Sequence, residues 1–163
     1  MAQMTDPMSA LVQFHEAFEQ GLIPVQPRRR DRTLLFAPDT PNGHTRFNYM
    51  RADGSTLTVL VMFAQKGLEN GEPVFNIGYA VPEAYRGHGL AKATLTAALA
   101  ELSAGLAGAR ISAIHVEAVI APDNLASIGV AAAIFDAAPT LIIDSESRLP
   151  ALHYTRRVAS PVD

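Results

Sequence analysis

The sequence lacks several features that define whole classes of protein. None of its 163 residues is cysteine, which excludes a disulfide framework, a thiolate metal site and a cysteine nucleophile. No run approaches the roughly eighteen apolar residues that a membrane span needs, and the first 21 residues lack the basic and apolar regions of a signal peptide. We therefore expect a soluble protein of the cytoplasm that has no membrane partner.

Charge is also sparse in this chain. Charged residues make up 18% of the sequence, and the formal net charge is −3 at pH 7. This balance argues against the broad basic surface of a nucleic-acid-binding protein, so we expect no nucleic-acid partner. One local positive cluster, formed by Arg28, Arg29, Arg30 and Arg32, follows two prolines and is interpreted as a solvated loop.

Hydrophobic residues are plentiful, at 48% of the chain, which is enough for the core of one domain covering residues 1–163. Helical spacing predicts an N-terminal helical segment within 1–22, a helix of about four and a half turns from Leu90, and a short helix at 125–135. Apolar runs predict strands at 33–37, 46–51, 56–64, 74–81, 111–120, 140–144 and 151–156. This order indicates an α/β (α+β) domain that ends in a loose tail at 159–163.

The most informative segment runs from Val81 to Ala91, between a predicted strand and the long helix. The first NH groups of a helix have no partner within it and lie at the positive end of its dipole. Gly87 and Gly89 remove side chains there, so the turn is suited to a pyrophosphate, although a glycine-rich turn that only begins a helix has the same pattern. The P-loop and dinucleotide motifs are excluded, since no Gly-Lys-Ser/Thr follows and position 92 is Lys92.

Two motifs in this order resemble the GNAT superfamily of N-acetyltransferases. The first is Arg-x-x-Gly-x-Ala, which begins at Arg86 and follows the strand motif Ile77-Gly78-Tyr79. The second is Asn-x-x-Ser, which begins at Asn124 at the end of another predicted strand. This version is most similar to the branch of the ribosomal-protein-alanine acetyltransferases, and the detailed resemblance covers residues 74–135.

The resemblance implies a GNAT-like, mostly antiparallel mixed sheet that is flanked by helices and whose central strands, 74–81 and 111–120, splay apart. It also implies acetyl-CoA (coenzyme A) as the cofactor, with its pantetheine arm between those strands and no metal. The residues assigned to cofactor binding in this way are Val81, Arg86, Gly87, His88, Gly89, Leu90, Ala91, Asn124 and Ser127. Asn124 also fits the N-cap of the helix at 125–135.

The acid and base of the reaction are less clearly marked. Glu117 and His115 share one face of a predicted strand, and Glu117 is our first candidate for the base, although both also fit satisfied polar groups near a strand end. Many GNAT relatives carry an acidic residue on the strand before the pyrophosphate loop, where this chain has the amide Asn76. Many also carry a tyrosine on the helix that follows the Asn-x-x-Ser motif, and residues 128–135 contain none. Ser127 and Tyr154 are the remaining candidates for the proton donor.

The sequence thus predicts an acyl-CoA-dependent N-acyltransferase. It would move an acetyl group to the primary amine of a small molecule or a peptide N-terminus, by direct attack in a ternary complex. The alternative is a non-catalytic acyl-CoA sensor or interaction module of the same fold, which the amide at Asn76 and the missing tyrosine both suggest. A homodimer is compatible with the resemblance.

Overall fold

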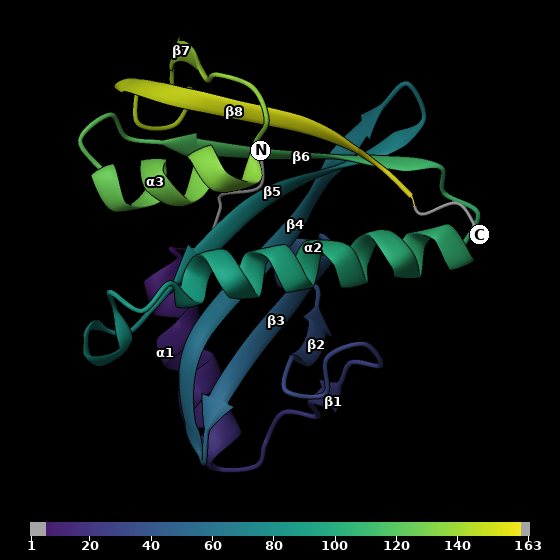
Figure 1. Cartoon of the computed structure of the whole chain (residues 1–163), viewed down its shortest axis with the longest axis vertical. Helices are drawn as coiled ribbons and strands as arrows, with labels where there is room; N and C mark the ends of the chain where they lie inside the picture. Colours follow the sequence, from purple (N-terminus) through teal and green to yellow (C-terminus); the bar gives the residue numbers. More distant parts are fainter. Residues whose placement is uncertain (1–5, 161–163) are drawn as a thin grey trace.

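The computed structural model describes residues 6–160, which form an eight-stranded sheet with the strand order β1-β2-β3-β4-β5-β6-β8-β7 (Figure 1). The helices are α1 (Pro7–Glu19), α2 (Leu90–Gly108) and α3 (Leu125–Ile134), with short 3-10 turns at Pro41–Gly43 and Glu83–Tyr85. The strands are β1 (Gln26–Pro27), β2 (Leu35–Asp39), β3 (Arg46–Asp53), β4 (Thr56–Glu69), β5 (Glu72–Ala80), β6 (Ala113–Ile120), β7 (Thr140–Ile143) and β8 (Pro150–Ala159).

Every strand pair except β5–β6 is antiparallel. The Asp53-Gly54 pair between the predicted strands 46–51 and 56–64 is a hairpin signal, and β3 and β4 form that hairpin: Asp53 pairs with Thr56, and Gly54 takes a positive φ of 60° in the two-residue turn. The parallel pair needs a long crossover, which α2 provides. The predicted mixed, mostly antiparallel sheet is therefore confirmed.

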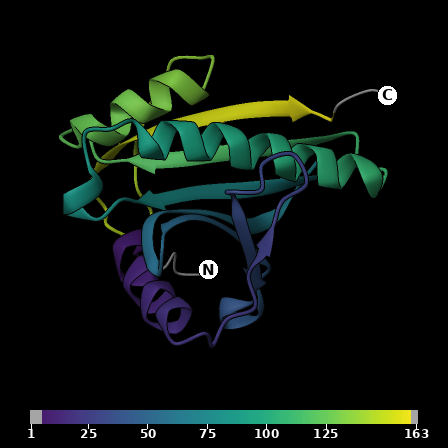
Figure 2. The same ribbon diagram turned by 60° about the horizontal axis from the view of Figure 1, so that its bottom comes forward.

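The two faces of the sheet carry separate hydrophobic clusters. Side chains of α2 and α3 pack with the central strands in the larger cluster, which includes Phe63, Leu95 and Val116. On the opposite face, α1 packs on β4 and β5 through Leu11. Figure 2 shows α2 and α3 on one side of the sheet and α1 on the other. Because strand side chains alternate between faces, a residue's register decides which helix it meets.

Helix α2 has the length and apolar composition of a membrane-spanning helix. In this fold, however, Leu95, Ala98 and Leu102 are buried, and all three belong to the cluster on the sheet. It runs through Gly105 and ends at Gly108, so its 19 residues make about five turns rather than the predicted four and a half. Packing on the sheet offsets the low helix propensity of glycine.

Two further sequence predictions need correction. The segment 23–32 is not all loop, because β1 pairs with β2 there, and the Arg28 guanidinium stacks 4.3 Å from the ring centroid of Phe36. The tail at 159–163 is ordered at its start, because Ala159 pairs with Ala113 and the Ser160 NH donates to the Ser112 carbonyl. The rest of that tail, from residue 161, lies outside the described residues.

Candidate functional site

A gap opens in the sheet where β5 and β6 diverge. The two strands pair only from Val74 to Asn76 on β5 and from His115 to Glu117 on β6. Both strands continue beyond these pairs, to Ala80 and to Ile120. The predicted splay of the central strands is therefore confirmed, and the unpaired ends keep main-chain NH and carbonyl groups free along the gap.

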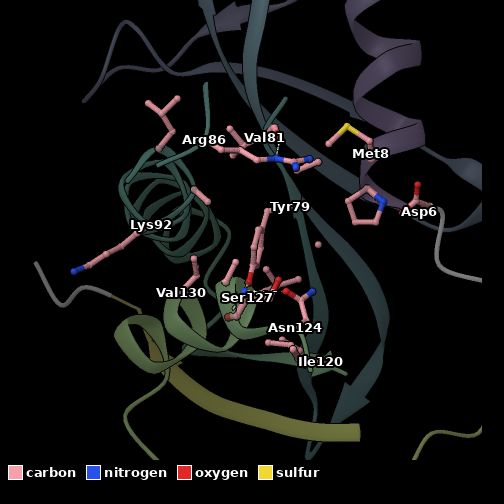
Figure 3. A pocket seen from close by; sticks show the side chains of 18 of the residues that line it. Asp6, Met8, Tyr79, Val81, Arg86, Lys92, Ile120, Asn124, Ser127 and Val130 are labelled. Carbon is pink, nitrogen blue, oxygen red and sulfur yellow. Dashed lines mark hydrogen bonds between the residues drawn. The ribbon is translucent and has the colours of Figure 1, made fainter. Parts of the chain in front are cut away.

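A cavity of about 650 Å³ occupies this gap. Consecutive residues of each strand line it, 77–81 on the β5 side and 118–121 on the β6 side, so it touches the strand edges rather than one face of the sheet. The other lining residues come from the start of α1, the turn before α2, and the first turns of α2 and α3 (Figure 3): Asp6, Pro7, Met8, Tyr85, Arg86, Gly87, Gly89, Leu90, Ala91, Lys92, Asn124, Ala126, Ser127 and Val130.

The turn before α2 has the geometry of an anion site. Gly87 and Gly89 adopt positive φ angles of 83° and 72°, a left-handed conformation that an L side chain would strain. Gly89 is the N-cap of α2 and provides no side-chain cap, so the amides of Leu90 and Ala91 keep their NH groups available. These amides open the longest helix of the described chain and lie at the positive end of its dipole.

Arg86 adds a positive charge beside this turn. Its Nε donates to the Val81 carbonyl over 2.8 Å, which fixes the side chain against the end of β5 (Figure 3). Lys92 also lines the cavity, but Figure 3 shows its ammonium directed away from it. A phosphate group at the helix terminus would therefore meet main-chain amides and one anchored guanidinium.

The start of α3 forms the opposite wall. Asn124 is its N-cap, and the Asn124 Oδ1 accepts from the Ser127 NH over 3.2 Å. Tyr79 reaches across from β5 and donates its hydroxyl to the Ser127 carbonyl over 3.0 Å (Figure 3). Burial raises the pKa of Tyr79, so its hydroxyl stays protonated at neutral pH. The capping role that the sequence left open for Asn124 is thus present.

The structure brings most of the predicted cofactor-binding residues together. Those that line the cavity are Val81, Arg86, Gly87, Gly89, Leu90, Ala91, Asn124 and Ser127. His88 is exposed and does not line it. Tyr154 does not line it either, because it is buried in the core with its ring 5.4 Å from that of Phe135. Of the catalytic candidates, only Ser127 lies in the cavity wall.

Glu117 lies where the gap begins, on the sheet face opposite α3. It is in the last pair before the strands part, opposite Asn76, and the next residue, Ala118, lines the cavity. Its side chain is only 10% exposed, and both carboxylate oxygens are engaged. The Lys66 ammonium contacts Oε1, and His153 Nε2 lies 3.3 Å from Oε2.

His115 has the contacts of a satisfied polar group near a strand end, which is the second of the two readings that the sequence left open for it. Its Nε2 lies 3.0 Å from Glu72 Oε1, at the closed end of the β5–β6 pair. Arg157 of β8 holds the same carboxylate with two hydrogen bonds of 3.0 and 2.8 Å. The pKa of Glu72 is lowered to about 2, chiefly by the hydrogen bonds from Arg157 and to a lesser extent by that from His115. This cluster joins three strands just beyond the gap.

Sequence reasoning missed Lys66 and His153 beside Glu117, and Tyr79 within the cavity. A signal for His153 was present, because alternation in the predicted strand 151–156 places its side chain on one face of the sheet and those of Leu152 and Tyr154 on the other. Its partner was not predictable, because pairing β8 with β6 requires the sheet order. Lys66 had no signal, since the predicted strand ended at Ala64 and β4 continues to Glu69.

No protein-family model matches the sequence, and neither does any curated protein. Solved structures do match. A complex of RimL, a ribosomal L7/L12 alpha-N-protein acetyltransferase, with coenzyme A has a TM-score of 0.56 and 18% identity, over 72% of this chain and 64% of that chain. An acetyltransferase of the GNAT family from Streptococcus pneumoniae has a TM-score of 0.50 and 8% identity, over 73% and 70%. The chain has the fold of the GNAT acetyltransferases.

The NatC complex bound to Gag peptide and CoA matches this GNAT fold as well, with a TM-score of 0.52 and 13% identity, over 69% of this chain and 70% of that chain. The chain spans less than two thirds of the RimL protein in the coenzyme A complex. At these identities the likeness is one of fold. Function must therefore be argued from the cavity and its residues.

Proposed function

We propose that this protein is an acyl-CoA-dependent N-acyltransferase that transfers an acetyl group to a primary amine. One observation carries the proposal: the cavity joins the uncapped start of α2 to a gap between two parallel strands. The first feature suits a pyrophosphate and the second suits an extended, amide-containing arm. Few biological ligands other than coenzyme A combine a pyrophosphate with an extended, amide-containing arm that carries an acyl group as a thioester.

The residues present fit this cofactor. The amides of Leu90 and Ala91, with Arg86, would hold the pyrophosphate, and the unpaired edges of β5 and β6 would accept the pantetheine amides as an added strand. Bound acetyl-CoA supplies an activated acyl group as a thioester. Solved structures of the same fold, the RimL and NatC complexes, contain coenzyme A, which supports this assignment.

The chain's own residues would chiefly position the reactants. Orientation of two reactants contributes roughly 7 to 11 kcal/mol, whereas one positioned acid or base contributes about 10²- to 10⁴-fold in rate. Glu117 is our candidate for the base, because it borders the gap. Ser127 is the candidate donor that lies in the cavity wall, and the buried position of Tyr154 favours a core role for that residue.

The acceptor in this proposal is the amine of a protein N-terminus or of a small molecule. The RimL match is an alpha-N-protein acetyltransferase, and the NatC match contains a Gag peptide, so relatives of this fold support a protein N-terminus. Segments without a recognisable motif, including α1 and the loop before β2, would form the acceptor surface. Asp6, Pro7 and Met8 at the start of α1 already line the cavity.

An acceptor screen tests the proposal directly. The purified protein is mixed with acetyl-CoA and a panel of peptides with free N-termini and small amines, and released CoA and acetylated product are measured by a thiol assay and mass spectrometry. We expect CoA release that depends on the amine. CoA binding without release for any amine would favour the non-catalytic module, and equal affinity for CoA and simple nucleotides would refute the cofactor assignment.

A further inference from the structure

The Glu117 carboxylate is closed in by its neighbours. Its side chain is 10% exposed, Lys66 contacts one oxygen, and His153 lies 3.3 Å from the other. Lys66 is itself 54% exposed, but its ammonium has no acceptor atom and cannot take up a proton from the carboxylate. The neighbouring His153 side chain is 28% exposed and touches the carboxylate through Nε2, so its ring connects Glu117 with solvent.

The sheet places His153 beside the open part of the gap. On β8 it is directly opposite Val119 of β6, while Glu117 is opposite Thr155. Val119 lines the cavity between β5 and β6 and also a second hollow of about 520 Å³ at the turn between β7 and β8. His153 is therefore one strand away from the gap, and its partner in the register, Val119, lines both hollows.

We propose that His153 is a proton-relay residue that acts through Glu117, an inference that rests on the proposed acyl transfer. When the amine nitrogen bonds the acyl carbon and coenzyme A leaves as a thiolate, an amine N–H bond would break and its proton would bind the Glu117 carboxylate. It then crosses the 3.3 Å contact to His153 Nε2, while the proton on Nδ1 leaves to water. One proton passes from amine to solvent and no electrons are transferred. Imidazole suits this step because it exchanges protons near neutral pH.

Among the charged groups near His153, Glu117 is the carboxylate that contacts its ring. Glu117 faces it from β6, and Lys66 of β4 contacts the other oxygen of that carboxylate. His115 of β6, Glu72 of β5 and Arg157 of β8 are paired with one another at the closed end of the sheet, where His115 also contacts Glu69 of β4. On the β7 side, the residue opposite His153 is the uncharged Thr140.

The pH dependence of kcat/KM tests the relay. His153→Gln keeps a hydrogen-bonding side chain that cannot titrate, and His44→Gln, at an exposed histidine of the turn before β3, serves as the control. We expect His153→Gln to lower kcat/KM at pH 7 by about 10²-fold, the lower end for a positioned acid or base, and to move the acidic limb of the profile. In His153→Ala, added imidazole should restore part of the activity.

A second readout does not depend on turnover. The ¹⁵N chemical shift of His153 Nε2, followed by NMR in the full-length protein, should change when Glu117→Gln replaces the carboxylate that it contacts. An unchanged Nε2 signal, or a His153→Gln enzyme with the wild-type pH profile, would overturn the relay while leaving acyl transfer intact. Absence of CoA release from the wild-type protein with every amine would instead refute the proposed function.

Discussion

The turn before α2, with Gly87 and Gly89, offers the sharpest test of the proposed cofactor site. Gly89 has φ 72° and ψ 17° at the start of α2, and no atom lies within 4 Å of a Cβ built on it. A side chain at this position therefore meets backbone strain but no steric clash. Gly89→Gln and Gly89→Glu introduce the same bulk and the same strain, and they differ only in one negative charge. The pair separates electrostatics from folding.

The strain can be estimated from the dihedral angles. An L residue in the left-handed region costs about 1–2 kcal/mol. For a domain of this size, that corresponds to a fall in Tm of roughly 2–8 °C, since 1 kcal/mol shifts Tm by roughly 2–4 °C. Both variants should therefore fold with a similar, modest loss of thermal stability. Circular dichroism melts would check this before any binding measurement.

The charge should appear only in the binding of the cofactor. A carboxylate about 7 Å from a phosphate charge, at an effective dielectric constant of about 20, costs roughly 2 kcal/mol, or about 30-fold in Kd. We expect Gly89→Glu to bind CoA about 30-fold more weakly than Gly89→Gln by isothermal titration calorimetry at low salt. The difference should shrink in 1 M salt, where the Debye length is about 3 Å. Equal affinities of the two folded variants would refute the phosphate assignment.

Two further predictions concern the cap of α3 and the closed end of the gap. Asn124→Ala should lose about 1 kcal/mol of stability with the N-cap, whereas Asn124→Ser should keep the cap; if the amide also contacts the cofactor, both variants should bind CoA several-fold more weakly by calorimetry. Glu72→Gln should have a lower free energy of unfolding than wild type at pH 7, because the pKa of Glu72 falls from 4.5 to about 2 on folding. In urea titrations, the difference in unfolding free energy between wild type and variant should be complete above pH 5 and disappear toward pH 2. Glu69→Gln, at a more exposed carboxylate beside the same His115, is the control and should show less of this dependence.

Local signals predicted most of the fold. Alternating and helical spacing placed seven strands and three helices within a few residues of their observed positions, because each of these elements buries one regular face. Two-residue β1 was missed, since a strand that short has no periodicity. Strand ends were also missed: β4 continues five residues beyond the predicted Ala64, where its side chains become exposed and hydrophobic spacing gives no information.

The site was predictable in part, and the limit is physical. Gly87 and Gly89 stand out because other residues adopt their backbone angles only with strain, so the turn before α2 can be recognised in the sequence itself. Side chains that meet across strands leave no such record. Lys66, Glu117 and His153 come from β4, β6 and β8, and their meeting depends on a sheet order in which β8 lies between β6 and β7.

The sheet can hold an open gap because each half is complete without it. β5 is paired with β4 from Glu72 to Ala80, and β6 is paired with β8 along its whole length from Ala113 to Ile120. Each strand beside the gap thus has one fully bonded edge, and its other edge stays free over the last residues without loss of the strand.

The two halves are joined at the closed end of the gap, where two ion pairs add to the main-chain pairing of β5 with β6. Glu72 links β5 to Arg157 of β8, and Glu117 links β6 to Lys66 of β4. Both pairs lie beside the three residue pairs that still connect β5 and β6. The angle between β5 and β6 is set where the two strands last touch. These ion pairs would therefore hold the angle of the gap as well as stabilise the fold. Weakening the Glu72 pair should therefore reach the cofactor site, even though neither of its residues lines the cavity.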